Sequence, residues 1–332
     1  MTNTKVSNVS EQSDKADASS LLDPQTRVIV EMLERDPFLD PEMAPSQMRK
    51  AFDAFYAKIG FPALEVANVN NMKVPSEAGP IAIRVYKPQS TNDFPKPILV
   101  FIHGGAMMMG SLNSYDGLCR RLANKSDCII ISTSYRLSPE HKFPCAVEDV
   151  LVVFKWAHKN AASLGGDQER LAIGGESGGG YLAAVVTQQL RDDANISIAF
   201  QLLINPAIGR RANSKSMEKY AAGFFFEPEA LDWIYSQYLD DMSELSNPMV
   251  SPILASSFGN LPPAFIIVAG CDILRDDIEL YAHLLKEAGV AVETSTYENT
   301  IHGFTVMGGV IDAGVRAIDE SAAKLRIALA DA

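Results

Sequence analysis

A pentapeptide of the form G-x-S-x-G constrains this chain more than any other stretch, because it stands between a buried strand and a helix. Residues 170–173 form a short apolar run of strand type, and residues 181–190 return to helical spacing. Between them, Gly175-Glu-Ser-Gly-Gly179 sets the hydroxyl of Ser177 among glycines. A serine at the tip of a strained turn projects its Oγ outward, and the two outer glycines avoid collision with neighbouring backbone. The pattern predicts a nucleophilic serine on a strand–turn–helix.

Strands and helices alternate over most of the chain, which indicates an α/β fold with a mostly parallel central sheet and helices on both faces. Strands are predicted near residues 66–74, 81–86, 97–102, 128–132, 170–173, 198–204, 263–269 and 291–297. Helices are predicted near residues 24–35, 45–59, 115–124, 146–160, 181–190, 278–288 and after 312. The continuous apolar run at 97–102 is typical of a strand buried on both faces.

The segment 205–250 interrupts this alternation, because it is rich in aromatic residues and contains no clear strand. Two amphipathic helices precede the first strand and need an apolar surface to cover. Since α/β folds bind ligands beyond the carboxyl ends of their strands, we expect these segments to form a helical cap over the site. A helical bulge with its own small core is the alternative. The expected parts are a flexible tail at 1–20, cap helices at 21–60, a catalytic core at 61–205 and 251–332, and a cap insertion at 206–250.

Composition and charge narrow the class of protein. The formal net charge of −12 argues against nucleic acid or an anionic membrane surface as a partner. The polar N-terminus has no signal-peptide pattern, and no apolar run reaches the length of a membrane span. The four cysteines have no metal-type spacing, which is typical of thiols in a reducing compartment. We therefore expect a cytoplasmic protein.

A serine hydroxyl needs a general base within hydrogen-bond reach, and that base needs an acid to orient it. In the α/β-hydrolase arrangement the chain order is Ser, acid, His, which leaves two of the five histidines, His283 and His302. His283 falls inside a predicted helix, whereas His302 follows a strand in a turn beside Gly303. His302 is therefore the preferred base.

The acid is expected where the strand before the base ends. Asp272 occupies that position, directly after the apolar run at 263–269 and Gly270-Cys271. Asp276 and Asp277 stand four and five residues further on, at the start of a helix, where capping explains them without catalysis. Asp272 is therefore the preferred acid.

The tetrahedral intermediate of acyl transfer also needs hydrogen-bond donors for its oxyanion. His103-Gly-Gly-Ala106 follows a predicted strand. The backbone N–H groups of Gly105 and Ala106 can supply two donors, and that of Gly178 a third. Glycines let the backbone approach the reacting atom, and His103 and Gly104 are expected to support the loop.

Together these motifs resemble the hormone-sensitive lipase family of α/β-hydrolases, the bacterial family IV esterases, over nearly the whole chain after residue 20. The block YRLSPEHKFPCAVED, which begins at Tyr135, is very close to the family's YRLAPEHxFPAAxED. HGGAMMMG from His103, GESGGG from Gly175, DILRDD from Asp272 and IHGF from Ile301 are similar to the family's other motifs.

The resemblance implies an α/β-hydrolase fold with a helical cap, and hydrolysis of carboxylic esters without a metal or organic cofactor. It implies Ser177 as nucleophile, His302 as base and Asp272 as the acid that orients the base. It also suggests a homodimer through an edge strand, for which residues 291–297 are the candidate. The candidates for the substrate pocket are Met107, Phe225, Tyr181 and Ile301.

Four positions depart from the family's pattern. Ala106 replaces the third glycine of the oxyanion loop, Met107 an aromatic residue, Glu176 an aspartate and Gly178 an alanine. The methyl group of Ala106 has a cost if the backbone there needs a positive φ. The other changes are expected to shift activity or substrate range, since none of them removes a catalytic group.

Three functions follow from these observations. The leading one is a serine carboxylesterase that cleaves short- to medium-chain esters through an acyl-enzyme, because a cap restricts access to the serine. The same triad acting on lactones, amides or thioesters is the second. A non-catalytic receptor for small molecules is the third, and the intact Ser177, Asp272 and His302 count against it. The expected partner is a small-molecule ester.

Overall fold

The computed structural model of the chain describes residues 20–90, 94–210 and 214–330, so the predicted tail lies outside the described residues except for Ser20. Eight strands form one sheet in the order β1-β2-β4-β3-β5-β6-β7-β8. β2 pairs antiparallel with both β1 and β4, and the other five pairs are parallel. The predicted α/β fold with a mostly parallel sheet is confirmed.

The elements follow the predicted order, and most begin and end within a few residues of the predicted bounds. The strands are β1 Asn68–Val74, β2 Ile81–Lys87, β3 Lys96–Ile102, β4 Ile129–Thr133, β5 Gly166–Glu176, β6 Phe200–Ile204, β7 Ala264–Cys271 and β8 Val292–Ile301. The α-helices are α2 Pro24–Arg35, α3 Pro45–Ile59, α4 Asp116–Ser126, α5 Cys145–Leu164, α6 Gly178–Leu190, α7 Lys215–Lys219, α8 Pro228–Tyr238, α9 Arg275–Glu287 and α10 Asp312–Ala328. Short 3₁₀ turns span Met242–Ser246, Pro252–Leu254 and Phe304–Val306.

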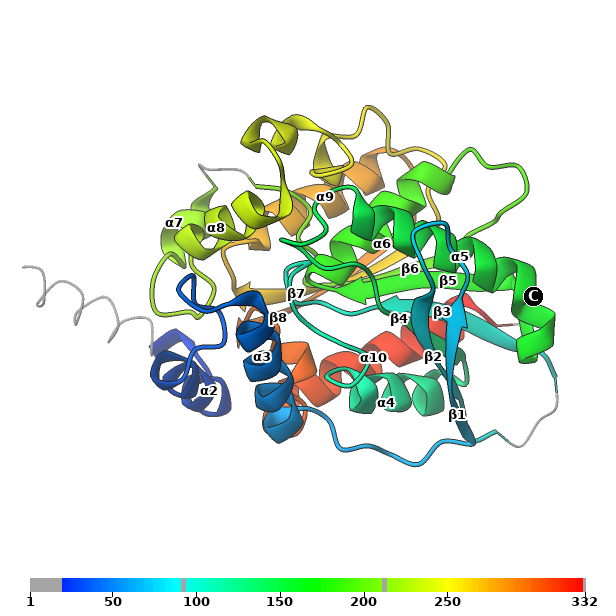
Figure 1. The fold of residues 1–332 in the computed structure, drawn as a ribbon, viewed down its shortest axis with the longest axis horizontal. Coiled ribbons are helices and arrows are strands. Elements are labelled where there is room, and N and C mark those ends of the chain that lie inside the picture. The colour runs from blue at the N-terminus through cyan, green and yellow to red at the C-terminus, as the bar shows by residue number, and fades with distance from the viewer. Residues whose placement is uncertain (1–19, 91–93, 211–213, 331–332) are drawn as a thin grey trace, which may run out of the picture.

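The sheet is the middle of three layers (Figure 1). α4 and α10 lie together on one face, and α5, α6 and α9 lie on the other. α2, α3, α7 and α8 gather at one end of the sheet, beyond the carboxyl ends of its parallel strands. Within the described ranges, no helix combines the length and apolar character needed to cross a bilayer.

The inner strands are apolar because helices cover them on both sides. Every residue of β4, β6 and β7 is buried, as expected of strands in the middle of a parallel sheet. β8 forms the edge of the sheet and keeps exposed residues along its length. Apolar side chains therefore form a core on both faces of the sheet. The carboxyl ends of the strands lie at the edge of this core.

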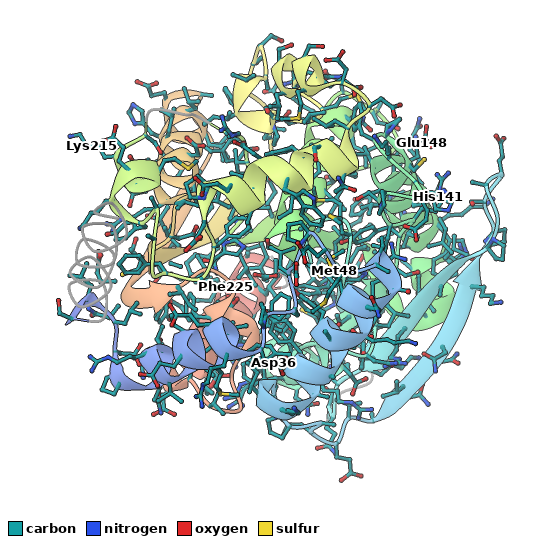
Figure 2. All side chains as sticks on the ribbon, turned by 60° about the vertical axis from the view of Figure 1, so that its left-hand side comes forward. Asp36, Met48, His141, Glu148, Lys215 and Phe225 are labelled. Carbon is teal, nitrogen blue, oxygen red and sulfur yellow. The ribbon has the colours of Figure 1, made fainter. Side chains whose placement is uncertain are left out.

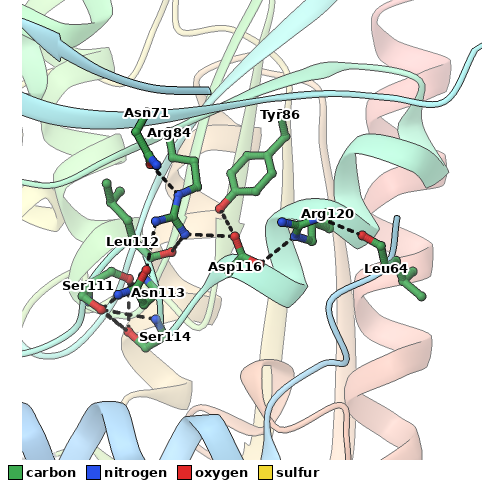
Figure 3. Close-up of polar contacts among 10 residues, drawn as sticks. All are labelled: Leu64, Asn71, Arg84, Tyr86, Ser111, Leu112, Asn113, Ser114, Asp116 and Arg120. Atoms are coloured by element: carbon green, nitrogen blue, oxygen red, sulfur yellow. Dashed lines mark hydrogen bonds and ion pairs between the residues drawn. The ribbon is translucent and has the colours of Figure 1, made fainter. Parts of the chain in front are cut away.

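A polar network fastens the segment after the predicted oxyanion loop to the sheet (Figure 3). Arg84 of β2 donates hydrogen bonds to the side chains of Asn113, at 2.9 Å, and Asp116, at 3.0 Å. Asp116, at the start of α4, also accepts hydrogen bonds from Tyr86 at 2.9 Å and Arg120 at 2.6 Å. One end of the loop is thus held by charge-assisted hydrogen bonds, which are among the stronger ones in proteins.

Aromatic side chains join the N-terminal helices to the segment 206–250. Phe38, between α2 and α3, lies 5.1 Å from Phe52 and 5.5 Å from Phe225, both measured between ring centroids and both edge-on. Figure 2 shows Phe225 on the same face of the molecule as Asp36 and Met48, which belong to the N-terminal segment. The two segments therefore share apolar contacts over the carboxyl end of the sheet.

Candidate active site

Ser177 stands on a sharp turn between β5 and α6, as the pentapeptide predicts. Its backbone has a positive φ of 53° with ψ −117°, a strained conformation for a residue with a side chain. A Cβ added to Gly175 would overlap the backbone of Gly179, and one added to Gly179 would overlap the carbonyl of Ile102. Only glycine fits at these two positions, so the sequence can make this turn and present Oγ above the sheet.

Three distant side chains meet at this turn. Ser177 Oγ lies 2.7 Å from His302 Nε2, and His302 Nδ1 lies 2.6 Å from Asp272 Oδ2. Asp272 follows β7 and His302 follows β8, two neighbouring strands at the edge of the sheet. The hydroxyl, the imidazole and the carboxylate therefore form one chain of hydrogen bonds, with the geometry of a Ser-His-Asp triad.

The alternative residues lie elsewhere. His283 is on α9 and faces Glu287 at 3.3 Å, with 62% of each side chain exposed. Asp276 accepts a hydrogen bond from the backbone N–H of Ser216 at 3.1 Å. Asp272 is 1% exposed, and its second oxygen accepts a hydrogen bond from Leu274 N–H at 2.9 Å. The structure thus brings together the residues that the sequence favoured.

Charge around His302 favours its protonated form. Burial alone favours the neutral imidazole, but the charge and hydrogen bond of Asp272, with the nearby charge of Glu176, outweigh it and raise the pKa of His302 above its ordinary value of 6.5. A raised pKa suits a base that must hold a proton during acyl transfer. It also means that His302 stabilises the fold most below its unfolded pKa, and that this contribution is lost as the pH rises through the folded pKa.

We expect kcat/KM for ester hydrolysis to rise with pH along one ionisation whose midpoint lies above 6.5. His302 must be neutral to accept the proton of Ser177, and its pKa is raised. A pH series with an uncharged ester measures the midpoint. An acid limb centred below 6.5 would contradict the assignment of His302 as the base.

The loop 103–110, here called the oxyanion loop, faces the first turn of α6. A Cβ added to Gly178 would lie 3.4 Å from the backbone nitrogen of Ala106 and 3.3 Å from that of Met107. The loop turns tightly because the carbonyl of Gly105 accepts hydrogen bonds from Met108 N–H at 3.0 Å and Met109 N–H at 2.8 Å. These contacts leave the N–H groups of Ala106 and Met107 close to the start of α6, beside Ser177.

The backbone of the oxyanion loop is left-handed at three consecutive positions, and the family has glycine at the first two of them. Gly105 has φ +108°, Ala106 +57° and Met107 +56°. The left-handed region costs a residue with a Cβ roughly 1–2 kcal/mol. The cost expected for the methyl group of Ala106 is therefore present.

Replacing Ala106 with glycine should increase the free energy of unfolding by roughly 1 kcal/mol. Glycine removes the strain of the left-handed backbone in the folded state, and the larger conformational entropy that it gives the unfolded chain offsets part of this gain. Urea unfolding of the two proteins measures the difference. Ala57 of α3 is exposed and helical, so Ala57→Gly is the control and should lose about 1 kcal/mol. If both variants lost the same free energy of unfolding, the left-handed backbone at Ala106 would not be a source of strain.

His103 and Gly104 support the loop from below. Burial lowers the pKa of His103 to about 4, against a hydrogen bond to the Gly104 carbonyl, so its ring is neutral at neutral pH. The ring stacks on Tyr135 at 4.4 Å between centroids, and the Tyr135 hydroxyl donates to the His103 carbonyl at 2.9 Å. Tyr135 opens the YRLSPEH block, so that block contributes directly to holding the loop.

A pocket lined mainly by aromatic and aliphatic side chains opens beside the triad. Its wall consists of Phe38, Leu39, Phe52, Tyr56, Gly105, Ala106, Met109, Tyr115, Glu176, Ser177, Phe225, Phe226, Ile234, His302 and Gly303. Phe226 lies flat against the imidazole of His302, with 4.9 Å between ring centroids and 24° between planes. The N-terminal helices and the segment 206–250 thus supply most of the apolar wall.

Of the four predicted pocket residues, Phe225 lies in this wall and the other three do not. Tyr181 is directed by α6 toward Tyr238 at 3.1 Å and donates to the carbonyl of Met249 at 2.8 Å. Ile301 is fully buried at the end of β8. Met107 is 3% exposed and packs its sulfur against Gly178.

Glu176 has a role that the sequence did not indicate. Its Oε2 accepts a hydrogen bond from the Tyr115 hydroxyl at 2.7 Å, and Oε1 has no hydrogen-bond partner among the described residues. Burial raises the pKa of Glu176, against the charge of His302 and the hydrogen bond from Tyr115. A Cβ on Gly104 would overlap this carboxyl group, so the glycine of the loop makes room for it. The carboxyl group of Glu176 is therefore packed against the oxyanion loop and hydrogen-bonded to Tyr115.

Within the described ranges, no group of three or more His, Cys, Asp or Glu side chains is arranged to hold a metal ion. The cysteines at 119, 128, 145 and 271 are free thiols, and three of them are buried.

Comparison with known proteins agrees with this geometry. Residues 99–306 match the family model of the alpha/beta hydrolase fold. Carboxylic ester hydrolase LipN of Mycobacterium tuberculosis is 39% identical over 260 residues, which cover 76% of this chain and 69% of that protein. Esterase LipI of the same organism is 33% identical over 318 residues, which cover 95% of this chain and 97% of the relative.

Solved structures give the same match. An ester hydrolase from the metagenome of Lake Arreo superimposes with a TM-score of 0.87 at 38% identity, covering 92% of this chain and 98% of that one. The fold and the site define an α/β-hydrolase. Within that class, the chain belongs to the hormone-sensitive lipase family, the bacterial family IV.

Proposed function

We propose that this protein is a serine carboxylesterase in which Ser177 is the nucleophile, His302 the base and Asp272 the acid that orients the base. The carrying observation is the continuous chain of hydrogen bonds from Ser177 Oγ through His302 to Asp272, at 2.7 and 2.6 Å. Two relatives with extensive alignments are named carboxylic ester hydrolase and esterase, which supports the same activity here.

The reaction proceeds in two halves. Ser177 Oγ attacks the acyl carbon while His302 Nε2 takes its proton, and the carbonyl oxygen becomes an oxyanion that accepts hydrogen bonds from Gly105, Ala106 and Gly178 N–H. The bond to the alcohol then breaks, and the alcohol leaves with the proton from His302. Water repeats the sequence on the acyl-enzyme, which frees the acid and restores Ser177.

Short- to medium-chain acyl groups fit this site best. The pocket is bounded by Phe38 and Phe52 from the N-terminal segment and by Phe225 and Phe226 from the insertion. These rings make the site apolar and limit its length. The parts 21–60 and 206–250 act together as a cap, with 61–205 and 251–332 as the catalytic core. We place the enzyme in the cytoplasm.

A fluorophosphonate probe tests the nucleophile, and a p-nitrophenyl ester series tests the substrate class. The wild type should be labelled and Ser177→Ala should not, while hydrolysis should peak at short or medium acyl chains. Faster turnover of lactones, amides or thioesters than of any simple carboxylic ester would show that one of these compounds, and not a simple ester, is the preferred substrate class. An unlabelled, inactive wild type would favour a receptor.

A homodimer through β8 is the proposed assembly. β8 is the outer strand of the sheet and pairs with β7 on one side. An edge strand offers backbone groups to a second strand. Light scattering after gel filtration should give twice the 36.1 kDa chain mass, and Thr294→Pro should reduce it. A wild type that stays at the single-chain mass at high concentration would contradict this assembly.

A further inference from the structure

Arg49 of α3 connects the N-terminal helices to the oxyanion loop. Its Nε donates to the carbonyl of Met108 at 2.8 Å, and its Nη2 donates to the carbonyl of Ser138 at 2.9 Å. The guanidinium also forms a two-pronged pair with Glu140, at 2.9 and 2.6 Å. One side chain therefore reaches two segments that lie 59 and 89 residues further along the chain.

The bonded carbonyls control the direction of the loop's N–H groups. A peptide unit is planar and trans, so its carbonyl and its N–H point in opposite directions. Because Arg49 holds the Met108 carbonyl outward, the N–H of Met109 in the same unit points inward and reaches the Gly105 carbonyl at 2.8 Å.

The preceding unit is fixed in the same manner. The Met107 carbonyl accepts hydrogen bonds from Ser138 N–H at 2.9 Å and from its hydroxyl at 3.2 Å. Met108 N–H in that unit points inward to the Gly105 carbonyl at 3.0 Å. Arg49 also donates to the Ser138 carbonyl. It therefore contributes to both anchors of the loop, namely the hydrogen bonds that hold the Met108 carbonyl and those that hold the Met107 carbonyl.

These anchors matter because the loop does not rest in a relaxed conformation. Ala106 and Met107 are both left-handed, which costs roughly 1–2 kcal/mol for each residue. Without external hydrogen bonds the loop would gain by relaxing toward ordinary backbone angles. Relaxation would rotate the N–H group of Ala106, one of the proposed oxyanion donors, away from the reacting carbonyl.

The pair with Glu140 does not explain Arg49 by itself. The two side chains are 26% and 51% exposed, and ion pairs of such exposure contribute little to stability. The planar fork of arginine makes several directed hydrogen bonds at once, which lysine cannot reproduce.

We propose that Arg49 is a positioning residue for the oxyanion hole: through the carbonyls of Met108 and Ser138 it holds the strained loop in the conformation that directs backbone N–H groups at the reacting carbonyl. The inference rests on the proposed esterase function. It assigns part of the transition-state geometry to a residue outside the catalytic core.

The test compares Arg49→Met, Arg49→Lys, Glu140→Gln and the control Lys50→Ala, which removes the neighbouring exposed cation on α3. Each variant is assayed with p-nitrophenyl acetate, and kcat is expressed per site titrated with a fluorophosphonate. Binding of a trifluoromethyl ketone, which forms a tetrahedral adduct with the serine, is measured alongside. Thermal unfolding reports stability separately.

Arg49→Met should lower kcat per titrated site about tenfold or more, with KM within about twofold, because loss of a complete oxyanion donor costs about a hundredfold or more. The ketone should bind more weakly by the same factor. Arg49→Lys should lose less than Arg49→Met, while Glu140→Gln and Lys50→Ala should stay within about threefold of wild type.

A kcat per titrated site within about twofold of wild type in Arg49→Met, whatever its melting temperature, would overturn the proposal. So would weaker ester binding with unchanged ketone binding, or equal losses in Lys50→Ala. If Arg49→Met does not fold, Arg49→Lys decides, since unchanged kcat and ketone binding there would also overturn it. Failure of the esterase function is distinguishable, because the wild type would then be neither labelled nor active.

Discussion

Replacing Ser177 with alanine is expected to lower kcat for ester hydrolysis by about a million-fold, since the serine and its base act as one unit. Ser177 Oγ lies 2.7 Å from His302 Nε2, so removal of either partner ends the same proton transfer. His302→Ala should therefore lose a similar factor. Steady-state assays with a p-nitrophenyl ester measure both variants.

The double variant gives the sharper result. Ser177→Ala combined with His302→Ala should be no slower than either single variant, because the second change removes a group that no longer has a function. If the loss of kcat in the double variant equalled the product of the losses in the two single variants, the two side chains would act independently. Such a result would contradict the triad although both atoms lie within hydrogen-bond distance.

Asp272→Asn is expected to lower kcat by about ten-thousand-fold while leaving the fold in place. The Asp272 carboxylate accepts from His302 Nδ1 at 2.6 Å, and an amide can present its N–H there and select the wrong tautomer. The change also removes the main charge that raises the pKa of His302 while burial remains, so the acid limb of kcat/KM should move to lower pH.

Asp276→Asn is the matched control for this change. Asp276 lies four residues further on and accepts a hydrogen bond from Ser216 N–H, which an asparagine oxygen can also do. Its kcat should stay within about threefold of wild type, with an unmoved acid limb. A loss of kcat in Asp276→Asn as large as that in Asp272→Asn would contradict the assignment of Asp272 as the acid.

Local sequence patterns were sufficient for the strands, the serine turn and the helices outside the segment 206–250, whereas α7 and α8 inside that segment were not predicted individually. The apolar run before His103 and the Asp-Pro pair before α2 mark their elements directly, and Asp23 caps α2 by accepting from Gln25 and Thr26 N–H. The meeting of Ser177, Asp272 and His302 was predictable because each follows a strand, and neighbouring parallel strands bring their carboxyl ends together.

The pocket was harder to predict because its wall depends on contacts between distant segments. Tyr181 follows the serine turn closely in sequence, yet its position on α6 directs it toward Tyr238. Phe38 lies in a connection between two helices, where no periodicity indicates its direction. Arg49 looks like any helix-face cation in the sequence, since its carbonyl partners lie on distant segments.

The stacking of Phe226 on His302 ties two properties of the enzyme together. The same ring lines the pocket and covers one face of the imidazole. A substitution at position 226 that enlarges the space for bulky esters therefore also hydrates His302 and changes its proton affinity. Variants selected at this position for new substrates should also show a shifted pH dependence of activity. Substrate range and pH dependence therefore cannot be changed independently at position 226.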